Sequence, residues 1–499
     1  MQHNVLSIDQ GTTSTRSIVF NSQGNIVAVA RKELTQQFPK PGWVEHNPIE
    51  IIAAVKETAE SAVGQLESGW KNIDTIGIAN QRETTLIWDR KTGIPVGNAI
   101  VWQDTRTNDF CSDLLAQGHS SSIKLSTGLK LNPYFSATKI RWLLDSITDG
   151  QKRAENGELC FGTIDSWIVF NLTERKKHLT DSTNASRTML LNIHNLNWDS
   201  EMLSLFNIPS EILPTVLPSA SDFGLASPNF FGSEISISGI AGDQHSSLYG
   251  QLCFKKGMTK CTYGTGAFIL TNEGNIPPSP NNRNDDDLLS TLGFQVGTRT
   301  CYASEGSIFA SGSTIQWLRD GLGIIKNASD TNNVSTLAKD NGGVYFVPAF
   351  SGLGSPHWNP EAKSIIVGMT RGTTRSHIIR AALESTAYQV KDVIDKSLSF
   401  TASNFPLRVD GGQARNPFLM QFQADIIDRP VEISKTTETT ALGAALIAGK
   451  HAGIWQTEKQ IESINKPIVR YEPQMKKSLR ISLYSGWKDA VKRCCMPPY

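Results

Sequence analysis

The chain repeats one design in its two halves: an apolar strand, a tight bend that contains Gly and Thr, a second strand and a turn that contains Asn and Gly. The first copy is "VLSIDQGTTSTRSIVFNSQGNIV" at 5–27, and the second is "TKCTYGTGAFILTNEGNI" at 259–276. Short apolar runs separated by Gly and Asn predict β-hairpins. The second hairpin is shorter, so the copies share a design and not a sequence. The repetition predicts a duplicated α/β domain.

The length of the chain agrees with such a duplication. A chain of 499 residues exceeds one comfortable hydrophobic core, so two or three domains are expected. We place the boundary near "GQLCFKKG", which gives an N-terminal domain at 1–251 and a C-terminal domain at 258–499. An apolar content of 39% is typical of a soluble globular protein.

Charge and composition argue against several classes of protein. The net charge is +1, with 48 basic and 47 acidic side chains, so no clustered basic excess predicts a nucleic-acid partner. No apolar run approaches the roughly 20 residues that span a bilayer, and no signal peptide is visible. The seven cysteines are scattered without a CxxC motif, which argues against a disulfide framework or zinc site and favours the cytoplasm.

The other expected elements follow from hydrophobic periodicity. We expect a helix that begins at Asn47-Pro48, a strand at 74–80 followed by a second strand, and a helix within 132–145. Further expected elements are a strand and helix within 237–251, a strand and amphipathic helix within 406–431, a helix at 439–453, and an exposed loop at 275–287.

The bend at 11–15 is the first candidate for chemistry. Successive backbone N–H groups in such a bend form a concavity that binds anions, and Gly11 permits a close approach. Arg16 adds a cation suited to phosphate oxygens, and Asp9 offers a hard oxygen ligand for Mg²⁺. An ordinary hairpin with common turn residues is the alternative, and the second Gly-Thr bend at 264–265 weighs against it.

The motif "NQRETT" places Arg82 and Glu83 directly after an apolar strand. A guanidinium donates and a carboxylate accepts hydrogen bonds, so the pair suits a hydroxylated ligand. A solvated surface pair is the alternative.

In "GIAGDQHSS", Asp243 and Gln244 lie between a strand and a helix. Spacing alone favours Asp243 as a helix N-cap, and the alternative is a general base that takes a proton from an alcohol. Gly411 and Gly412 allow close approach of a ring or phosphate, and Trp102 and Tyr134 are candidates for the wall of a small pocket.

Taken together, these motifs resemble a known family over about residues 4 to 490. They are "SIDQGTTSTRSIVF", "PGWVEHNP", "IGIANQRETTLIWD", "VWQDTRT", "GIAGDQHSSLYGQ", "TYGTGAFIL", "SGSTIQWLRDG" and "VDGGQARNPFLMQFQADI", in this order. The set resembles the carbohydrate-kinase family with the actin-like ATPase fold. Within that family, "NQRETT" and "PGWVEHNP" resemble the glycerol kinases more than the xylulose or gluconate kinases.

The resemblance implies two ribonuclease H-like domains that flank a deep cleft, with polyol and phosphates on the N-terminal side and nucleotide on the C-terminal side. It implies phosphorylation of glycerol by ATP·Mg²⁺ to sn-glycerol 3-phosphate, with Asp243 as the general base and closure of the domains to exclude water. The implied glycerol contacts are Arg82, Glu83, Tyr134, Asp243 and Gln244, with Trp102 and Phe268 as apolar walls. The implied nucleotide contacts are Thr12, Thr13, Ser14, Arg16, Thr265, Gly312, Gln316, Gly412 and Asn416, with Asp9 for the metal. We also expect a cytoplasmic homodimer or homotetramer that binds glycerol and ATP or ADP.

The sequence also departs from relatives in places. The loop "ASPNFFGSEI" at 226–235 lacks the arginine of members controlled by fructose 1,6-bisphosphate, and it lacks the histidine of members activated by phosphorylation. Pro417 replaces a common asparagine but suits the first turn of a helix. Three alternative functions stay open: a kinase for another polyol or ketose, an ATP-switched binding or filament module, and a degenerate kinase that senses glycerol.

Overall fold

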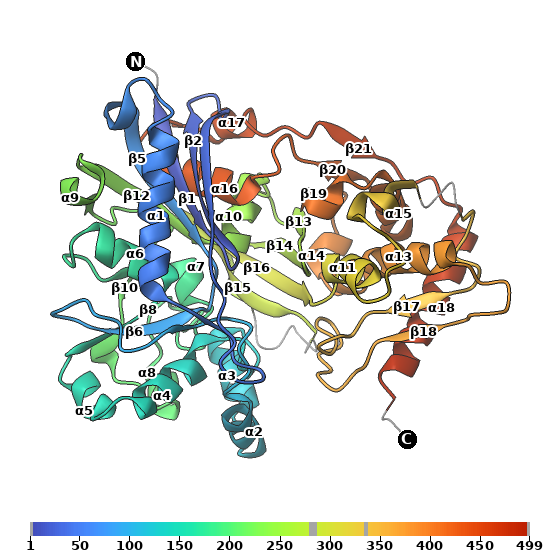
Figure 1. Ribbon diagram of the computed structural model, residues 1–499, viewed down its shortest axis with the longest axis horizontal. Coiled ribbons are helices and arrows are strands. Elements are labelled where there is room, and N and C mark those ends of the chain that lie inside the picture. The colour runs from blue at the N-terminus through green and yellow to red at the C-terminus, as the bar shows by residue number, and fades with distance from the viewer. Residues whose placement is uncertain (1–2, 279–286, 334–337, 497–499) are drawn as a thin grey trace.

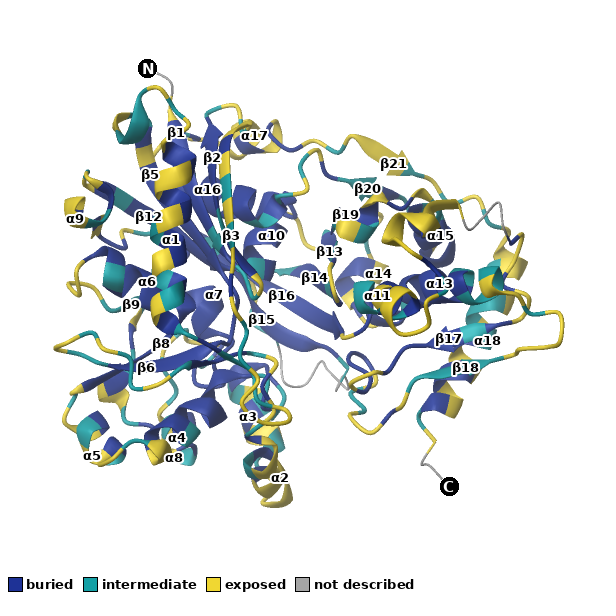
Figure 2. Cartoon of the chain, viewed as in Figure 1, coloured by how far each residue is buried: buried dark blue, intermediate teal, exposed yellow. Residues whose placement is uncertain are grey.

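The structure is a computed structural model that describes residues 3–278, 287–333 and 338–496. Two large mixed sheets lie side by side, with helices packed around them (Figure 1). The strands at the centre of both sheets are buried, whereas the outer faces of the covering helices are exposed (Figure 2).

The first large sheet contains the N-terminal hairpin. Its strands, in spatial order, are β11 (Leu225–Ala226), β12 (Ile235–Gly242), β5 (Ile73–Asn80), β1 (Asn4–Gln10), β2 (Ser14–Asn21) and β3 (Ile26–Glu33). Strand β1 is antiparallel to β2 and parallel to β5, which is parallel to β12.

The second large sheet repeats this pattern around the second hairpin. Its order is β15 (Leu289–Val296), β16 (Arg299–Ile308), β14 (Ala267–Gly274), β13 (Thr259–Tyr263), β19 (Leu407–Gly411), β20 (Val431–Ile433) and β21 (Val469–Tyr471). Strand β13 is antiparallel to β14 and parallel to β19, which is parallel to β20. The predicted duplication of an α/β design is therefore confirmed.

Smaller sheets and the remaining helices complete the fold. One small sheet contains, in spatial order, β4 (Glu45–His46), β7 (Ala99–Ile100), β6 (Thr85–Asp89) and β8 (Leu159–Thr163). A second pairs β10 (Thr215–Leu217) with β9 (Leu179–Asp181), and a third pairs β17 (Tyr345–Val347) with β18 (Ile365–Val367). Helices of the first half are α1 (Pro48–Val63), α2 (Asn108–Ala116), α3 (Ser120–Thr127), α4 (Ser136–Ser146), α5 (Gly150–Glu155), α6 (Ile164–Leu172), α7 (Ser182–Ala185), α8 (Ser200–Leu205), α9 (Pro228–Phe231) and α10 (Asp243–Gly250). Helices of the second half are α11 (Gly312–Asp320), α13 (Arg375–Ile394), α14 (Leu398–Thr401), α15 (Pro417–Ile427), α16 (Thr439–His451), α17 (Glu458–Glu462) and α18 (Lys477–Cys494).

The halves of the molecule are joined by the contact between two helices, α10 and α16. Helix α16 packs against α10 and also against β1, β5 and β12 of the first sheet, although it belongs to the second half of the chain. The approach is close enough to require glycine: a Cβ on Gly443 would lie 1.8 Å from the carbonyl oxygen of Ser246, and one on Gly77 would lie 2.3 Å from that of Ala444. The small residues at 439–453 therefore permit this packing.

Most of the expected elements are confirmed, with small shifts at their ends. Helix α1 begins where Asn47 accepts a hydrogen bond from the backbone N–H of Ile49 at 2.9 Å. Asn416 caps α15 in the same way, with Pro417 in its first turn. Of the expected loop at 275–287, residues 279–286 lie outside the described residues. The domain boundary at 251–258 stays a prediction.

Candidate active site

The bends of the two hairpins have the same construction. The N–H of Gly11 donates to the carbonyl of Ser14 at 3.0 Å, and the N–H of Gly264 donates to that of Gly266 at 2.8 Å. Within the described residues, no hydrogen bond engages the next two backbone N–H groups of either bend, which are Thr12 and Thr13 in one and Thr265 and Gly266 in the other. Each bend therefore presents two free donors that suit an anion.

Charge is added to the first bend by Asp9 and Arg16, which lie opposite each other in the register of β1 and β2. The Nη1 of Arg16 donates to Oε2 of Glu438 at 2.8 Å. Burial raises the pKa of Asp9 to about 7; Arg16 opposes this rise, whereas Asp243 and Glu438 add to it.

The pair Arg82 and Glu83 is buried, so the alternative of a solvated surface pair is wrong. Their side chains are 2% and 1% exposed. The guanidinium of Arg82 donates to both oxygens of Glu305, at 2.6 and 3.0 Å, and its Nε lies 3.2 Å from Oδ1 of Asp243. Although burial acts to lower it, Glu305 and Glu83 hold the pKa of Arg82 above its usual range.

Asp243 does not cap α10, so the interpretation favoured by spacing alone is wrong. Gly242 occupies the N-cap position because β12 runs directly into the helix, and Asp243 is the first helical residue. Oδ1 of Asp243 accepts from the N–H of Gln244 at 2.7 Å, and the side-chain amide of Gln244 donates to Oδ2 at 3.3 Å. The Asp243 side chain is 28% exposed, which leaves it accessible to a ligand.

Aromatic side chains join this cluster to both hairpins. The ring of Trp102 lies 5.5 Å from that of Tyr134 and 6.2 Å from that of Phe268, edge to face in each case. The indole N–H of Trp102 donates to the hydroxyl of Thr12 at 2.9 Å. Since Thr12 belongs to the first bend and Phe268 to β14, Trp102 contacts both halves of the molecule. Ser14 begins β2 and is buried.

The predicted nucleotide contacts are only partly brought together. The carbonyl of Thr265 accepts from the N–H groups of Ser311 and Ser313 at 3.0 Å, and Gly312 donates to the carbonyl of Gly264 at 3.0 Å, which joins the second bend to α11. Gln316 and Gly412 are exposed. Asn416 is buried and already engaged, because its oxygen caps α15 and its amide donates to Thr331 at 3.1 Å.

Three charged residues of this region were missed by sequence reasoning: Arg187, Glu305 and Lys260. Arg187 bridges Glu83 and Glu305, and Nζ of Lys260 donates to the side-chain oxygen of Gln244 at 2.5 Å. Burial lowers the pKa of Lys260. A charged residue inside a strand with few other charges, as in "CYASEGSIFA" and "TKCTYG", is the signal that could have found two of them.

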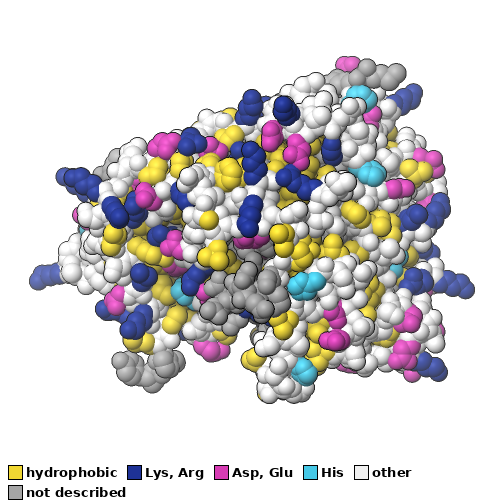
Figure 3. All heavy atoms as spheres, turned by 180° about the vertical axis from the view of Figure 1, so that it is seen from behind, with side chains coloured by type: hydrophobic (Ala, Val, Ile, Leu, Met, Phe, Trp, Pro, Cys, Tyr) yellow, Lys and Arg dark blue, Asp and Glu magenta, His cyan; other side chains and the backbone are white. Residues whose placement is uncertain are grey.

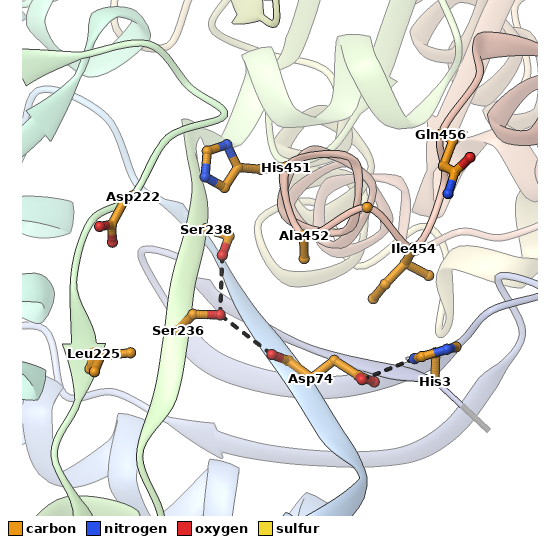
Figure 4. Close-up of a pocket in the computed structure, with 11 residues that line it drawn as sticks. His3, Asp74, Asp222, Leu225, Ser236, Ser238, His451, Ala452, Ile454 and Gln456 are labelled. Carbon is orange, nitrogen blue, oxygen red and sulfur yellow. Dashed lines mark hydrogen bonds and ion pairs between the residues drawn. The ribbon is translucent and has the colours of Figure 1, made fainter. Parts of the chain in front are cut away.

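A cavity of about 790 Å³ elsewhere involves none of the predicted site residues. Figure 4 shows its polar lining, in which His3 lies 3.0 Å from Asp74, and Ser236 donates to the carbonyl of Asp74 at 3.4 Å. On the face seen from behind, basic and acidic side chains are interspersed (Figure 3). Within the described ranges, no group of three or more His, Cys, Asp or Glu could hold a metal ion, and no helix is long and apolar enough to cross a membrane.

Comparison with known proteins finds matches over nearly the whole chain. Residues 4–250 match the N-terminal domain, and residues 259–452 the C-terminal domain, of the FGGY family of carbohydrate kinases. The glycerol kinase 2 of Thermotoga maritima is 50% identical over 492 residues, which cover 98% of each chain. The glycerol kinase of Lactobacillus acidophilus is 50% identical over 98% of this chain and 97% of its own.

Among solved structures, Plasmodium falciparum glycerol kinase with ADP superimposes with a TM-score of 0.91. It is 37% identical, and the match covers 100% of this chain and 99% of that one. The backbone described above therefore has the architecture of that protein throughout.

Proposed function

The chain belongs to the FGGY family of carbohydrate kinases, and from this membership we propose that it transfers the γ-phosphoryl group of ATP to glycerol, forming sn-glycerol 3-phosphate and ADP. The observation that carries the proposal is the contact of Arg82 with Asp243, 3.2 Å apart, beside a wall of three aromatic rings. Hydrogen-bonding groups that face an apolar wall suit a small alcohol, which has a polar edge and a hydrocarbon edge.

The polyol is held by groups of complementary character. Arg82 donates to its hydroxyls, and Glu83 and Asp243 accept from them. Tyr134 and Gln244 supply further hydrogen bonds, and Trp102 and Phe268 pack against the carbon chain. Burial raises the pKa of Tyr134, so its hydroxyl keeps its proton and can donate.

Asp243 acts as the general base. As the terminal hydroxyl oxygen forms its bond to the γ-phosphorus, the bond from that phosphorus to the bridging oxygen of ADP breaks, and the hydroxyl proton passes to Asp243. Arg82 holds the carboxylate from the side, since its Nε lies 3.2 Å from Oδ1. The two bends approach the phosphates from opposite halves of the molecule, and their closure excludes water that would otherwise hydrolyse ATP.

The phosphates are bound by the free N–H groups of both bends, by the hydroxyls of Thr12, Thr13, Ser14 and Thr265, and by Arg16. Gly312, Gln316, Gly412 and Asn416 line the rest of the nucleotide site. For Asn416 this requires its side chain to exchange a present partner, or its backbone to make the contact, because both of its side-chain groups are engaged.

Asp9 fits a role beside Mg²⁺. Its carboxylate has no hydrogen-bonding partner among the described residues, and its pKa of about 7 reflects burial without full compensation of charge. A cation would remove that penalty. Since Asp9 is a single ligand, water and phosphate oxygens would complete the shell, as Mg²⁺ prefers. The metal would neutralise charge on the phosphates during transfer.

The proposal is tested by Asp243→Asn in the full-length protein, with ADP release measured over a panel of polyols and ketoses. We expect wild type to prefer glycerol, and the variant to lose about 10²–10⁴-fold in kcat while it still binds glycerol in calorimetry. Asp320→Asn is the matched control, because Asp320 is exposed on α11 and forms an ion pair with its neighbour Arg319.

Each alternative predicts a different result in the same assays. Inert glycerol with rapid turnover of a pentulose would identify a ketose kinase. Nucleotide binding unaffected by Asp243→Asn, with no turnover of any substrate by wild type, would favour a binding module or a sensor. Sedimentation analysis and cell fractionation test the expected homodimer or homotetramer and its cytoplasmic location.

A further inference from the structure

Four buried charged side chains form a closed network beside the proposed polyol site. They are Arg82, Glu83, Arg187 and Glu305, and their side chains are 2%, 1%, 0% and 0% exposed. Two positive and two negative charges cancel, as burial requires, since an uncompensated charge in the interior is strongly destabilising. Three of the residues come from the first half of the chain, and Glu305 comes from β16 in the second sheet.

Glu305 fixes both guanidinium groups. It accepts from Nη1 and Nη2 of Arg82, at 2.6 and 3.0 Å, and from Nη2 of Arg187 at 3.1 Å. Although burial acts to raise it, Arg187 and Arg82 hold the pKa of Glu305 below its usual range. A bidentate pair of this kind defines the plane of the guanidinium. The position of Arg82 Nε beside Asp243 is therefore set by a residue of the other sheet.

Arg187 performs the same task for Glu83. Its Nε donates to Oε1 of Glu83 at 2.7 Å, while its Nη2 reaches Glu305. The other carboxylate oxygen of Glu83, Oε2, has no hydrogen-bonding partner among the described residues, so it is left to accept from a ligand. The backbone of Glu83 has φ +60°, a strained left-handed conformation of the kind found where a side chain is held for function.

One donor of the network is left without a partner among the described residues. Nη1 of Arg187 is buried without a hydrogen-bonding partner in the part of the chain that the structure describes. Arg187 therefore keeps one donor that none of its present hydrogen bonds uses. Its hydrogen bonds go to the two carboxylates, and its guanidinium lies 5.7 Å from the ring centroid of Tyr134 and 5.1 Å from that of Phe135.

We propose that Arg187 and Glu305 are positioning residues of the polyol site: Glu305 orients Arg82 toward Asp243, and Arg187 orients Glu83. The proposal rests on the proposed function, because it assigns Arg82 and Glu83 to the polyol. It adds that the second sheet determines the geometry of a site whose charged ligand-binding groups all lie in the first half of the chain.

Arg187 and Glu305 shift the pKa of Glu83 in opposite directions. Burial raises the pKa of Glu83; Arg82 and Arg187 lower it, and Glu305 raises it. The charged and titratable groups that face Glu83 are Arg82, Arg187, Glu305, Tyr134 and Lys139. Loss of the Arg187 charge therefore raises the pKa of Glu83, and loss of the Glu305 charge lowers it.

The test uses full-length Glu305→Gln, Arg187→Met and Arg187→Lys, with kcat and KM measured for glycerol and for ATP across pH. We expect kcat/KM for glycerol to fall about 100-fold in the first two variants, because small misplacement of binding groups has effects of this size. Most of the loss is expected in KM for glycerol, with KM for ATP within about 2-fold, because the nucleotide contacts are made elsewhere. Arg187→Lys keeps the positive charge but lacks the planar guanidinium that donates to two carboxylates, so its kcat/KM for glycerol should be intermediate.

The pH profile separates positioning from general damage. The acid limb of kcat/KM for glycerol should move to higher pH in Arg187→Met and to lower pH in Glu305→Gln, with Arg187→Lys near wild type. The matched control is Glu384→Gln, which alters a buried pair on α13, where Glu384 accepts from Arg380 at 2.7 Å. It should change thermal stability without changing KM for glycerol.

Each outcome has a distinct meaning. If wild type turns over glycerol while Glu305→Gln and Arg187→Met keep its KM within about 2-fold, or if both acid limbs move the same way, positioning is refuted. Wild-type protein without glycerol-dependent ADP release refutes the proposed function itself. Should Glu305→Gln fail to fold, as judged by ADP affinity, Arg187→Lys still decides, since an unchanged KM for glycerol in that variant refutes the positioning role.

Discussion

The two hairpins share a backbone and differ in chemistry. Both bends are closed by a hydrogen bond from a glycine N–H, and both leave two N–H groups free. Two residues before the glycine, the first hairpin has Asp9 opposite Arg16, whereas the second has Thr262 opposite Phe268. The position occupied by the Arg16 guanidinium in the first hairpin is thus occupied by the Phe268 ring in the second.

The two hairpins therefore share a backbone geometry but not their side-chain charges. The geometry that presents backbone N–H groups to an anion is common to both copies. The charges that suit phosphates and a metal are kept in the first copy alone. In the second copy the equivalent position supplies Phe268, which packs on Trp102 with ring centroids 6.2 Å apart. The first hairpin therefore contributes charged side chains, and the second contributes an apolar surface.

The largest expected difference between the two hairpins comes from removing the acid of the first. Asp9→Asn should lower kcat by about 10²–10³-fold at saturating Mg·ATP, because the proposed metal site loses its charged ligand. Thr262→Val at the equivalent position removes no charge and one hydrogen bond from Nζ of Lys260, at 2.9 Å, so its loss in kcat should be at most about 10-fold. Steady-state kinetics at varied Mg²⁺ concentration measure kcat of both variants. Equal losses of kcat would contradict the inference that the charged side chains of the first hairpin matter more than the equivalent residues of the second.

Shape should matter most in the second hairpin. A Cβ on Gly266 would lie 2.2 Å from the carbonyl oxygen of Ile308, whereas one on Gly11 would lie 3.3 Å from that of Ser14. Gly266→Ala should therefore destabilise the protein by about 2–3 kcal/mol, and Gly11→Ala by about 1 kcal/mol or less. Urea denaturation followed by circular dichroism gives the comparison; a larger effect at Gly11 would reverse our interpretation.

Exchanging the residues at the equivalent positions for conservative ones should separate the two substrates. Arg16→Lys should raise KM for ATP about 10-fold, because lysine lacks the planar fork that matches phosphate. Phe268→Leu should raise KM for glycerol about 5-fold through lost packing and leave KM for ATP unchanged. The opposite pattern of KM changes would show that the hairpins do not divide the substrates in this way.

The smallest effect is expected at Thr265. Its carbonyl is held by the N–H groups of Ser311 and Ser313, so the bend keeps its shape without the side chain. Thr265→Ala should therefore raise KM for ATP only about 3-fold, which corresponds to one modest hydrogen bond. An effect as large as that of Asp9→Asn would mean that the hydroxyl, and not the backbone, carries the contact.

Local patterns predicted much of the fold. The hairpins, the helix starts at Asn47-Pro48 and Asn416-Pro417, and the duplication itself were all read from neighbouring residues. Of the residues that the resemblance predicted for the site, Thr12, Tyr134 and Phe268 all contact Trp102. The local interpretation of Asp243 as a cap was wrong, because an acid at a strand–helix junction has the same sequence signature whether or not it caps.

What the sequence alone determined is therefore the set of hairpins, turns and helix ends, since these depend on interactions between residues a few positions apart. Tertiary structure decided which buried charges pair. Arg82 finds Glu305 in the second sheet, Arg187 joins Glu305 to Glu83, and α16 packs on the first sheet. A buried charge is compensated by whichever opposite charge the folded chain brings within reach, and no local pattern records that choice.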